Sequence, residues 1–79
     1  MHLRLEAAEV KVLEGRIQRV KAGPRVFVIE RTLVRFEHGG RWWRGELPRS
    51  YFILQSNQGV RLEVYVVAML EWTLSAVED

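Results

Sequence analysis

The sequence predicts a single small all-β domain, residues 1–79, of five or six antiparallel strands arranged as a strongly curved sheet or open barrel. Three observations support this fold class. First, 79 residues allow one domain with a thin hydrophobic core. Second, turn-forming residues recur at short intervals, at Gly15, Gly23-Pro24, Gly39-Gly40, Gly45, Pro48 and Asn57-Gln58-Gly59. Third, the segments between these turns are rich in Val, Ile, Phe and Tyr.

The N-terminal part is expected to begin irregularly and then enter the sheet. Residues 3–14 are rich in Leu, Glu and Ala, so residues 1–8 are expected to be a mobile or helical segment. Residues 9–14 (EVKVLE) alternate between apolar and polar side chains and turn at Gly15. Residues 16–21 (RIQRVK) form the next expected strand.

Residues 25–36 (RVFVIERTLVRF) have the strongest strand character of the chain. Their phase changes midway, because Phe27 and Ile29 share one face while Val34 and Phe36 share the other. A flat strand cannot bury both pairs on one side. The sequence therefore predicts a bulge, a bend or burial on both faces near residues 30–32.

The C-terminal part predicts one hairpin, followed by a segment for which a helix and a second hairpin compete. Residues 51–56 (YFILQS) form an expected strand, and Asn57-Gln58-Gly59 is the best hairpin turn of the chain. Residues 60–66 return with Val60, Leu62, Val64 and Val66 on one face. Residues 61–79 contain no Gly or Pro, so a C-terminal helix competes with a second hairpin ending in residues 72–77. The β-branched and aromatic run at 64–67 favours the hairpin.

Charge is distributed unevenly along the chain. The net charge is +2, but residues 16–49 are strongly basic and both ends are acidic. A basic middle fits a nucleic-acid surface, or it pairs with the acidic ends of the same chain or of a second copy. Only Lys11 and Lys21 of the 12 basic residues are lysines, which favours either a thermophilic or GC-rich source or ordinary compositional drift.

The chain offers no catalytic or cofactor-binding motif. It has no cysteine, and His2 and His38 are isolated, so neither a thiol site nor a metal site is expected. No phosphate-binding glycine motif is present. We therefore expect no enzyme activity and no cofactor. The chain also has neither a secretory signal nor an apolar run that could span a bilayer, so a cytoplasmic location is expected.

The segment Arg41-Trp42-Trp43-Arg44 is the most unusual local feature. On a strand, the two indoles would point to opposite faces, one into the core and one to the surface. Trp beside Arg suits base stacking with phosphate neutralisation, a protein-binding hot spot, or simple packing in a small core. The candidate interaction residues are Arg41, Trp42, Trp43, Arg44, Arg49, Tyr51 and Tyr65.

Four features occur in a recognisable order from residue 25 onward. They are Gly40-Arg41-Trp42-Trp43, then Arg49-Ser50-Tyr51-Phe52-Ile53-Leu54, then Gly59 with Leu62-Glu63-Val64-Tyr65, and finally Trp72-Thr73-Leu74. This order resembles a family of small bacterial proteins, and it is similar to the C-terminal region of the mutagenesis protein ImuB, a relative of Y-family polymerases. Ser50 and the segment 68–71 depart from the family pattern. The resemblance implies a non-catalytic role around error-prone DNA synthesis.

The expected function is therefore a protein-interaction module accessory to DNA repair or translesion synthesis, with a polymerase accessory complex as partner. The alternative is a single-stranded nucleic-acid-binding domain that uses the Arg and Trp side chains. A homodimer is also expected, because residues 51–56 and 60–67 are apolar on both faces and each face needs a cover. The competing cover is the segment 3–13 or a C-terminal helix of the same chain.

Overall fold

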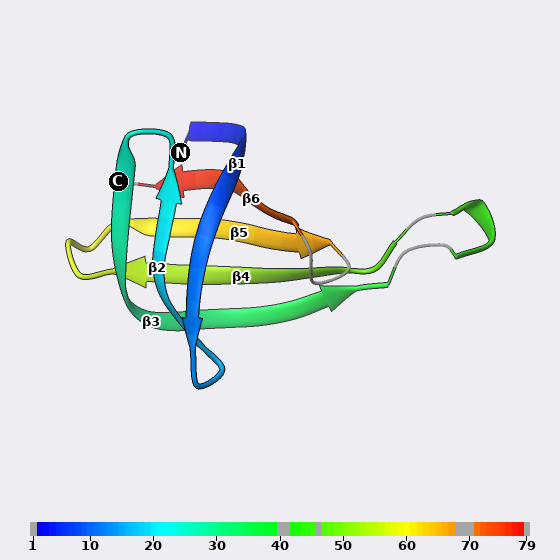
Figure 1. Ribbon diagram of the computed structural model, residues 1–79, viewed down its shortest axis with the longest axis horizontal. Helices are drawn as coiled ribbons and strands as arrows, with labels where there is room; N and C mark the ends of the chain where they lie inside the picture. The colour runs from blue at the N-terminus through cyan, green and yellow to red at the C-terminus, as the bar shows by residue number, and fades with distance from the viewer. Residues whose placement is uncertain (1, 40–41, 46, 68–70, 79) are drawn as a thin grey trace.

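The computed structural model describes residues 2–39, 42–45, 47–67 and 71–78. Over these residues, six antiparallel strands follow one another around a closed barrel (Figure 1). They are β1 (His2–Leu13), β2 (Arg16–Ala22), β3 (Arg25–His38), β4 (Arg49–Ser56), β5 (Arg61–Val67) and β6 (Glu71–Glu78). The all-β prediction is confirmed, and pairing of β1 with β6 makes the barrel closed rather than open.

The helical alternative for residues 1–8 is wrong from residue 2 onward, and Met1 lies outside the described residues. Residues 2–8 belong to β1 and pair with β6, from His2 opposite Val77 to Ala8 opposite Trp72. The second half of β1 pairs with β2 instead, from Glu9 opposite Lys21 onward. Hydrogen-bonding partners on two different strands outweigh the weak strand propensity of Leu, Glu and Ala here.

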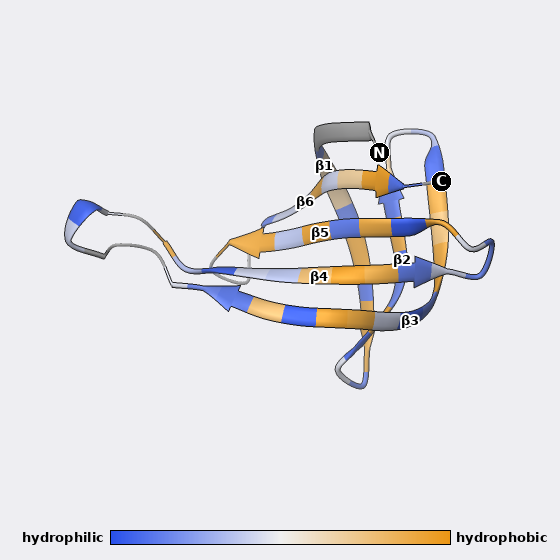
Figure 2. Ribbon diagram, turned by 180° about the vertical axis from the view of Figure 1, so that it is seen from behind, coloured by the Kyte–Doolittle hydropathy of each residue, from blue (hydrophilic) through white to orange (hydrophobic). Residues whose placement is uncertain are grey.

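The core lies between the β1–β2 hairpin and the sheet formed by β3 to β6. Figure 2 shows the alternation of apolar and polar residues along these strands. The buried cluster comprises Ile17, Val20, Ala22, Phe27, Ile29, Leu54, Leu62, Val64, Leu74 and Val77. On β2, the inward residues Ile17, Val20 and Ala22 leave Arg16, Arg19 and Lys21 exposed.

The predicted irregularity of the long third strand is confirmed. The register of β3 against β4 shifts between Ile29 and Arg31 and again between Thr32 and Val34. Phe27 and Ile29 are buried, whereas Val34 and Phe36 are 49% and 45% exposed. Val34 and Phe36 therefore remain on the outer face, opposite Phe27 and Ile29, and the two bulges do not bring them into the core.

The C-terminal residues form the hairpin and not the helix. β5 and β6 pair from Arg61 opposite Glu78 to Val67 opposite Glu71. Leu62, Val64 and Val66 are buried, as their alternation predicts. The turn that joins the two strands, residues 68–70, lies outside the described residues.

β3 and β4 continue beyond the barrel as a projecting hairpin, which we call the arm (residues 37–39, 42–45 and 47–50 as described; Figure 1). Its ladder extends to His38 opposite Arg49, and its tip is the 3-10 helix η1 (Trp42–Arg44). The expectation that Trp42 and Trp43 alternate on a strand is therefore wrong. The chain must reverse between Gly39 and Pro48, and the compact turn that does so ends at Gly45, whose φ is +75°.

Candidate interaction surfaces

The predicted site residues fall into two groups. Trp42, Trp43 and Arg44 form η1 at the tip of the arm, and Trp43 is 68% exposed. Arg49, Tyr51 and Tyr65 lie on β4 and β5. Arg41 and the side chain of Trp42 lie outside the described part of the structure.

Three aromatic side chains on neighbouring strands form the aromatic ladder, which we define as Phe36, Tyr51 and Tyr65. Tyr51 pairs with Phe36 on β3 and with Tyr65 on β5. The ring centroids of Phe36 and Tyr51 are 4.9 Å apart at an interplanar angle of 4°, and those of Tyr51 and Tyr65 are 5.3 Å apart at 42°. The Arg49 guanidinium lies 5.1 Å from the Tyr65 ring centroid. The ladder thus runs across the outer face of the barrel and ends under a cation.

Sequence reasoning did not select Phe36. The signal was present in the phase change of residues 25–36, which puts Val34 and Phe36 on the face opposite Phe27 and Ile29. Only the register of β3 against β4, however, shows that Phe36 lies directly beside Tyr51.

The surroundings of the ladder are apolar with balanced charge. Val34 pairs with Ile53 in the next row, so the apolar stripe is two rows wide. Nearby polar groups have partners: Arg31 Nε donates to Gln55 Oε1 at 3.1 Å, and Arg61 lies 4.0 Å from Glu78. The outer face of β3 to β5 therefore carries an apolar stripe with polar side chains at its edge, including Glu63, which lies opposite Ile53 on β5.

The orientation of the rings limits what can bind to them. Phe36 and Tyr51 are stacked almost parallel, so each covers one face of the other, and Arg49 lies over the Tyr65 ring. A nucleobase stacks on an open ring face. Several ring faces of the ladder are thus already covered by neighbouring groups, and its half-exposed Phe36 suits contact with apolar protein side chains.

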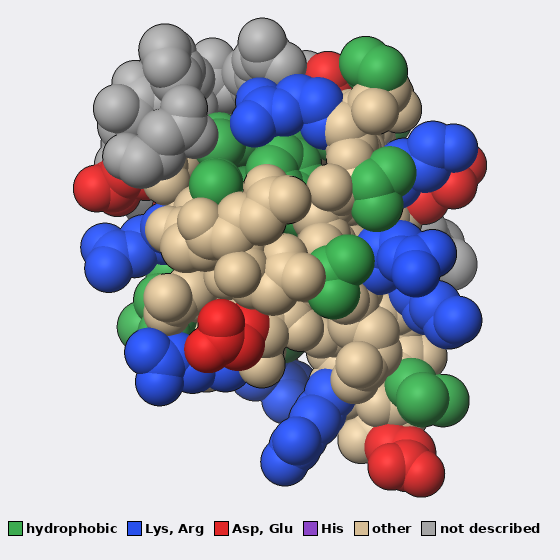
Figure 3. Space-filling view, turned by 90° about the vertical axis from the view of Figure 1, so that its left-hand side faces the viewer, with side chains coloured by type: hydrophobic (Ala, Val, Ile, Leu, Met, Phe, Trp, Pro, Cys, Tyr) green, Lys and Arg blue, Asp and Glu red, His purple; other side chains and the backbone are tan. Residues whose placement is uncertain are grey.

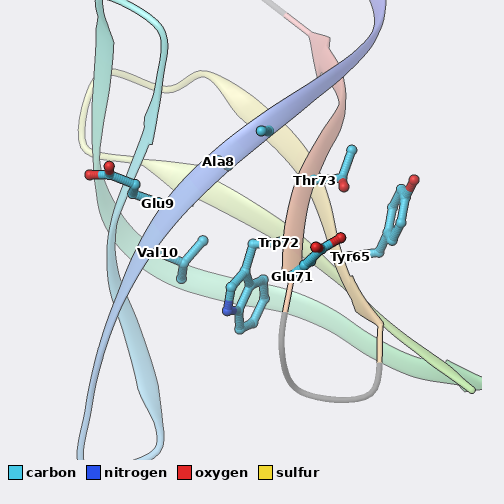
Figure 4. A pocket seen from close by; sticks show the side chains of 8 residues that line it. Ala8, Glu9, Val10, Tyr65, Glu71, Trp72 and Thr73 are labelled. Carbon is cyan, nitrogen blue, oxygen red and sulfur yellow. The ribbon is translucent and has the colours of Figure 1, made fainter.

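A hollow of about 760 Å³ lies beside the ladder, between β1, β5 and β6 (Figure 4). Trp72 points toward Val10 on β1, whereas Tyr65 points away from Trp72 on the other side of the sheet. The Trp72 ring packs against Phe52 with centroids 5.5 Å apart. Trp72 therefore contributes to the packing of the barrel. The acidic residues that line this hollow are Glu9 and Glu71.

The described residues contain no group of three or more His, Asp or Glu side chains that could hold a metal ion. None of the helices in the described part of the chain is long and apolar enough to cross a membrane. Lys and Arg side chains are spread around the end of the barrel seen in Figure 3 and do not form one patch there.

Comparison with protein-family models, with curated proteins and with solved structures finds no match to this chain.

Proposed function

We propose that this protein is a non-catalytic protein-interaction module and that its contact surface is the aromatic ladder together with the tip of the arm. The observation that carries the proposal is the ladder itself. Three rings and a guanidinium are aligned on an outer face where Phe36 and Val34 remain about half exposed. Tyr, Trp and Arg are the residues that contribute most to protein–protein binding energy.

The arm adds reach to this surface. It projects from the barrel and gives the molecule its longest dimension, 41 Å (Figure 1). Trp43 and Leu47 on the arm are 68% and 56% exposed. An indole held away from the body of a small domain can enter a pocket on a partner that the barrel itself cannot reach.

The resemblance to the C-terminal region of ImuB supplies the biological setting of the proposal. Three of the four features that carry the resemblance fall on the proposed contact surface: the Trp pair, the strand with Tyr51 and the strand with Tyr65. We infer that the partner is a protein of DNA repair or translesion synthesis.

The test is affinity capture from the native host with matched variants. Phe36→Ser and Trp43→Ala are expected to lose the captured partner, and strains carrying them to show a lower frequency of damage-induced mutations. Val26→Ser is the matched control, because Val26 is also a half-exposed residue of β3 but lies away from the ladder. Equal capture by all three variants would refute the proposed surface.

A second candidate is the binding of single-stranded nucleic acid by the Arg and Trp side chains of the arm. The observation in its favour is the exposure of Trp43 beside Arg44 in η1. In that case Arg41→Ala and Arg44→Ala should each flatten the salt dependence of oligonucleotide binding.

A further inference from the structure

The seam between β2 and β3 opens into a cleft. The two strands pair only from Arg19 opposite Val28 to Ala22 opposite Arg25. Beyond that point, residues 16–18 of β2 and 29–32 of β3 separate and enclose a cleft of about 490 Å³. Phe52 of β4 also lines this cleft.

The cleft carries a net positive charge. Arg16, Arg31 and Arg35 line it together with the carboxylate of Glu30, and Arg35 also lies 3.8 Å from Glu37 at the edge of the cleft. The Arg35 guanidinium lies 5.5 Å from the Phe52 ring centroid. Arg31 donates its Nε hydrogen to Gln55 Oε1, a neutral acceptor that does not cancel the charge of the guanidinium. Such a combination of guanidinium groups and an aromatic ring suits a planar, anionic ligand.

The positive charge continues along the outer face of β1 and β2. Arg19 lies directly opposite Lys11, and Lys21 is the next outward residue of β2. A shallow hollow of about 410 Å³ lies among these three side chains, and its lining also includes Val10 and one acid, Glu9, which lies opposite Lys21. The three cations therefore outnumber the single carboxylate at this face. Within the described part of the chain, none of the three forms an ion pair.

This arrangement is unfavourable for the barrel by itself. Like charges directly opposite one another destabilise a pair of strands. The chain avoids this between β5 and β6, where Arg61 lies opposite Glu78. An anionic ligand would relieve the repulsion between Lys11 and Arg19.

We propose that the cleft and the adjoining face of β2 bind single-stranded nucleic acid, with phosphates on Arg16, Arg19, Lys11 and Lys21 and a base in the cleft against the Arg35 guanidinium, which lies over Phe52. Arg19 and Lys21 are two residues apart, about 6.6 Å along a strand. This spacing is comparable with the step between phosphates of an extended single strand. The site uses neither the aromatic ladder nor the arm, so it goes beyond the proposed function and does not depend on it.

The experiment is fluorescence anisotropy of a labelled oligothymidylate titrated with the full chain. Four phosphate contacts predict a fall in affinity of about fiftyfold between about 50 and 200 mM salt. Arg16→Ala and Arg19→Ala should each weaken binding roughly five- to tenfold at about 50 mM salt and flatten the salt dependence. Both residues are exposed, and circular dichroism will verify that the variants remain folded.

Two comparisons isolate the site and the ligand. Arg61→Ala is the matched control, because Arg61 is an exposed arginine of β5 that lines neither the cleft nor the face of β2, and this variant should bind like the unchanged protein. An abasic oligonucleotide with the same number of phosphates should bind about fivefold more weakly, because it lacks the stacking contribution of a base. Duplex DNA and polyglutamate should also bind more weakly than the single strand.

The assignment is overturned by an absence of binding at low salt, or by binding that depends on Arg44 or Arg61 and not on Arg16 and Arg19. Equal affinity for the abasic strand, the duplex or polyglutamate would also overturn it, because the surface would then respond to charge alone.

Discussion

The Ser56 hydroxyl connects the end of β4 to the turn that follows it. Ser56 is 1% exposed, and its Oγ atom accepts hydrogen bonds from the backbone N–H groups of Gln58 at 3.2 Å and Val60 at 3.1 Å. The Ser56 backbone also pairs with Val60, its N–H donating to the carbonyl oxygen at 2.8 Å. One side chain therefore satisfies two backbone donors in the β4–β5 turn.

Ser56→Ala is expected to lower the free energy of unfolding by about 1–3 kcal/mol, because two partly buried N–H groups lose their acceptor. Urea denaturation should show a lower midpoint with an unchanged slope. Ser50→Ala, on the same strand, is the control, because the Ser50 side chain has no hydrogen bond within the described part of the chain. Equal destabilisation by the two substitutions would contradict this role of Ser56.

Among the elements, the arm is the part that contributes no residue to the core of the barrel. Its outer residues are exposed, and the buried cluster contains none of them. Replacing residues 39–48 by Asn-Gly would join His38 to Arg49, which are already cross-strand neighbours, through a two-residue turn.

We expect this shortened chain to keep its circular dichroism spectrum and to melt within a few degrees of the full chain. We also expect it to lose the captured partner, because it lacks Trp43. A large drop in melting temperature would show that the arm contributes to the stability of the barrel.

The sequence allowed prediction of the strands whose alternation is regular. Residues 60–66 show the period of two that a half-buried strand requires, and the break of phase at residues 30–32 identified the bulge. Residues 16–21 were identified as a strand by the turns on either side, since their apolar residues Ile17 and Val20 are three positions apart. The N-terminal half of β1 was missed because its composition favours a helix, and only pairing with a strand more than sixty residues away makes it extended.

The candidate surfaces were predictable only in part. Arg49, Tyr51 and Tyr65 were selected by residue type, but their alignment with Phe36 depends on the register across three strands. The cationic cleft could not be predicted, because it exists only where β2 and β3 cease to pair. The Trp pair was assigned to a strand because β propensity does not distinguish a strand from the turn at the end of a long hairpin.

At the scale of the whole molecule, the sheet formed by β3 to β6 has an inner face that other strands cover and an outer face that carries the aromatic ladder. The sequence offered the segment 3–13 as a cover for one face within a single chain. The β1–β2 hairpin, which contains this segment, covers the inner face of the sheet (Figure 1). The outer face retains the aromatic ladder with Val34 and Ile53 beside it. We propose that, in the absence of the partner, a second copy of the chain packs on this face by twofold symmetry.

Sedimentation equilibrium at micromolar concentration should then give a mass above that of one chain. Tyr65→Asp should dissociate the dimer, because it would bury an unpaired carboxylate at the interface. Tyr65→Phe should leave the dimer intact. A mass of one chain at every concentration would rule out the dimer and leave the surface to the partner alone.

Closure of the barrel by its first and last strands also determines how this domain can be connected to other proteins. His2 lies opposite Val77, so the two ends of the chain emerge side by side at one place on the surface (Figure 1). A domain with adjacent ends can be placed within a loop of a host protein without stretching either connection. Both the ladder and the cationic cleft would then remain accessible, since a single attachment point occupies little of the barrel surface.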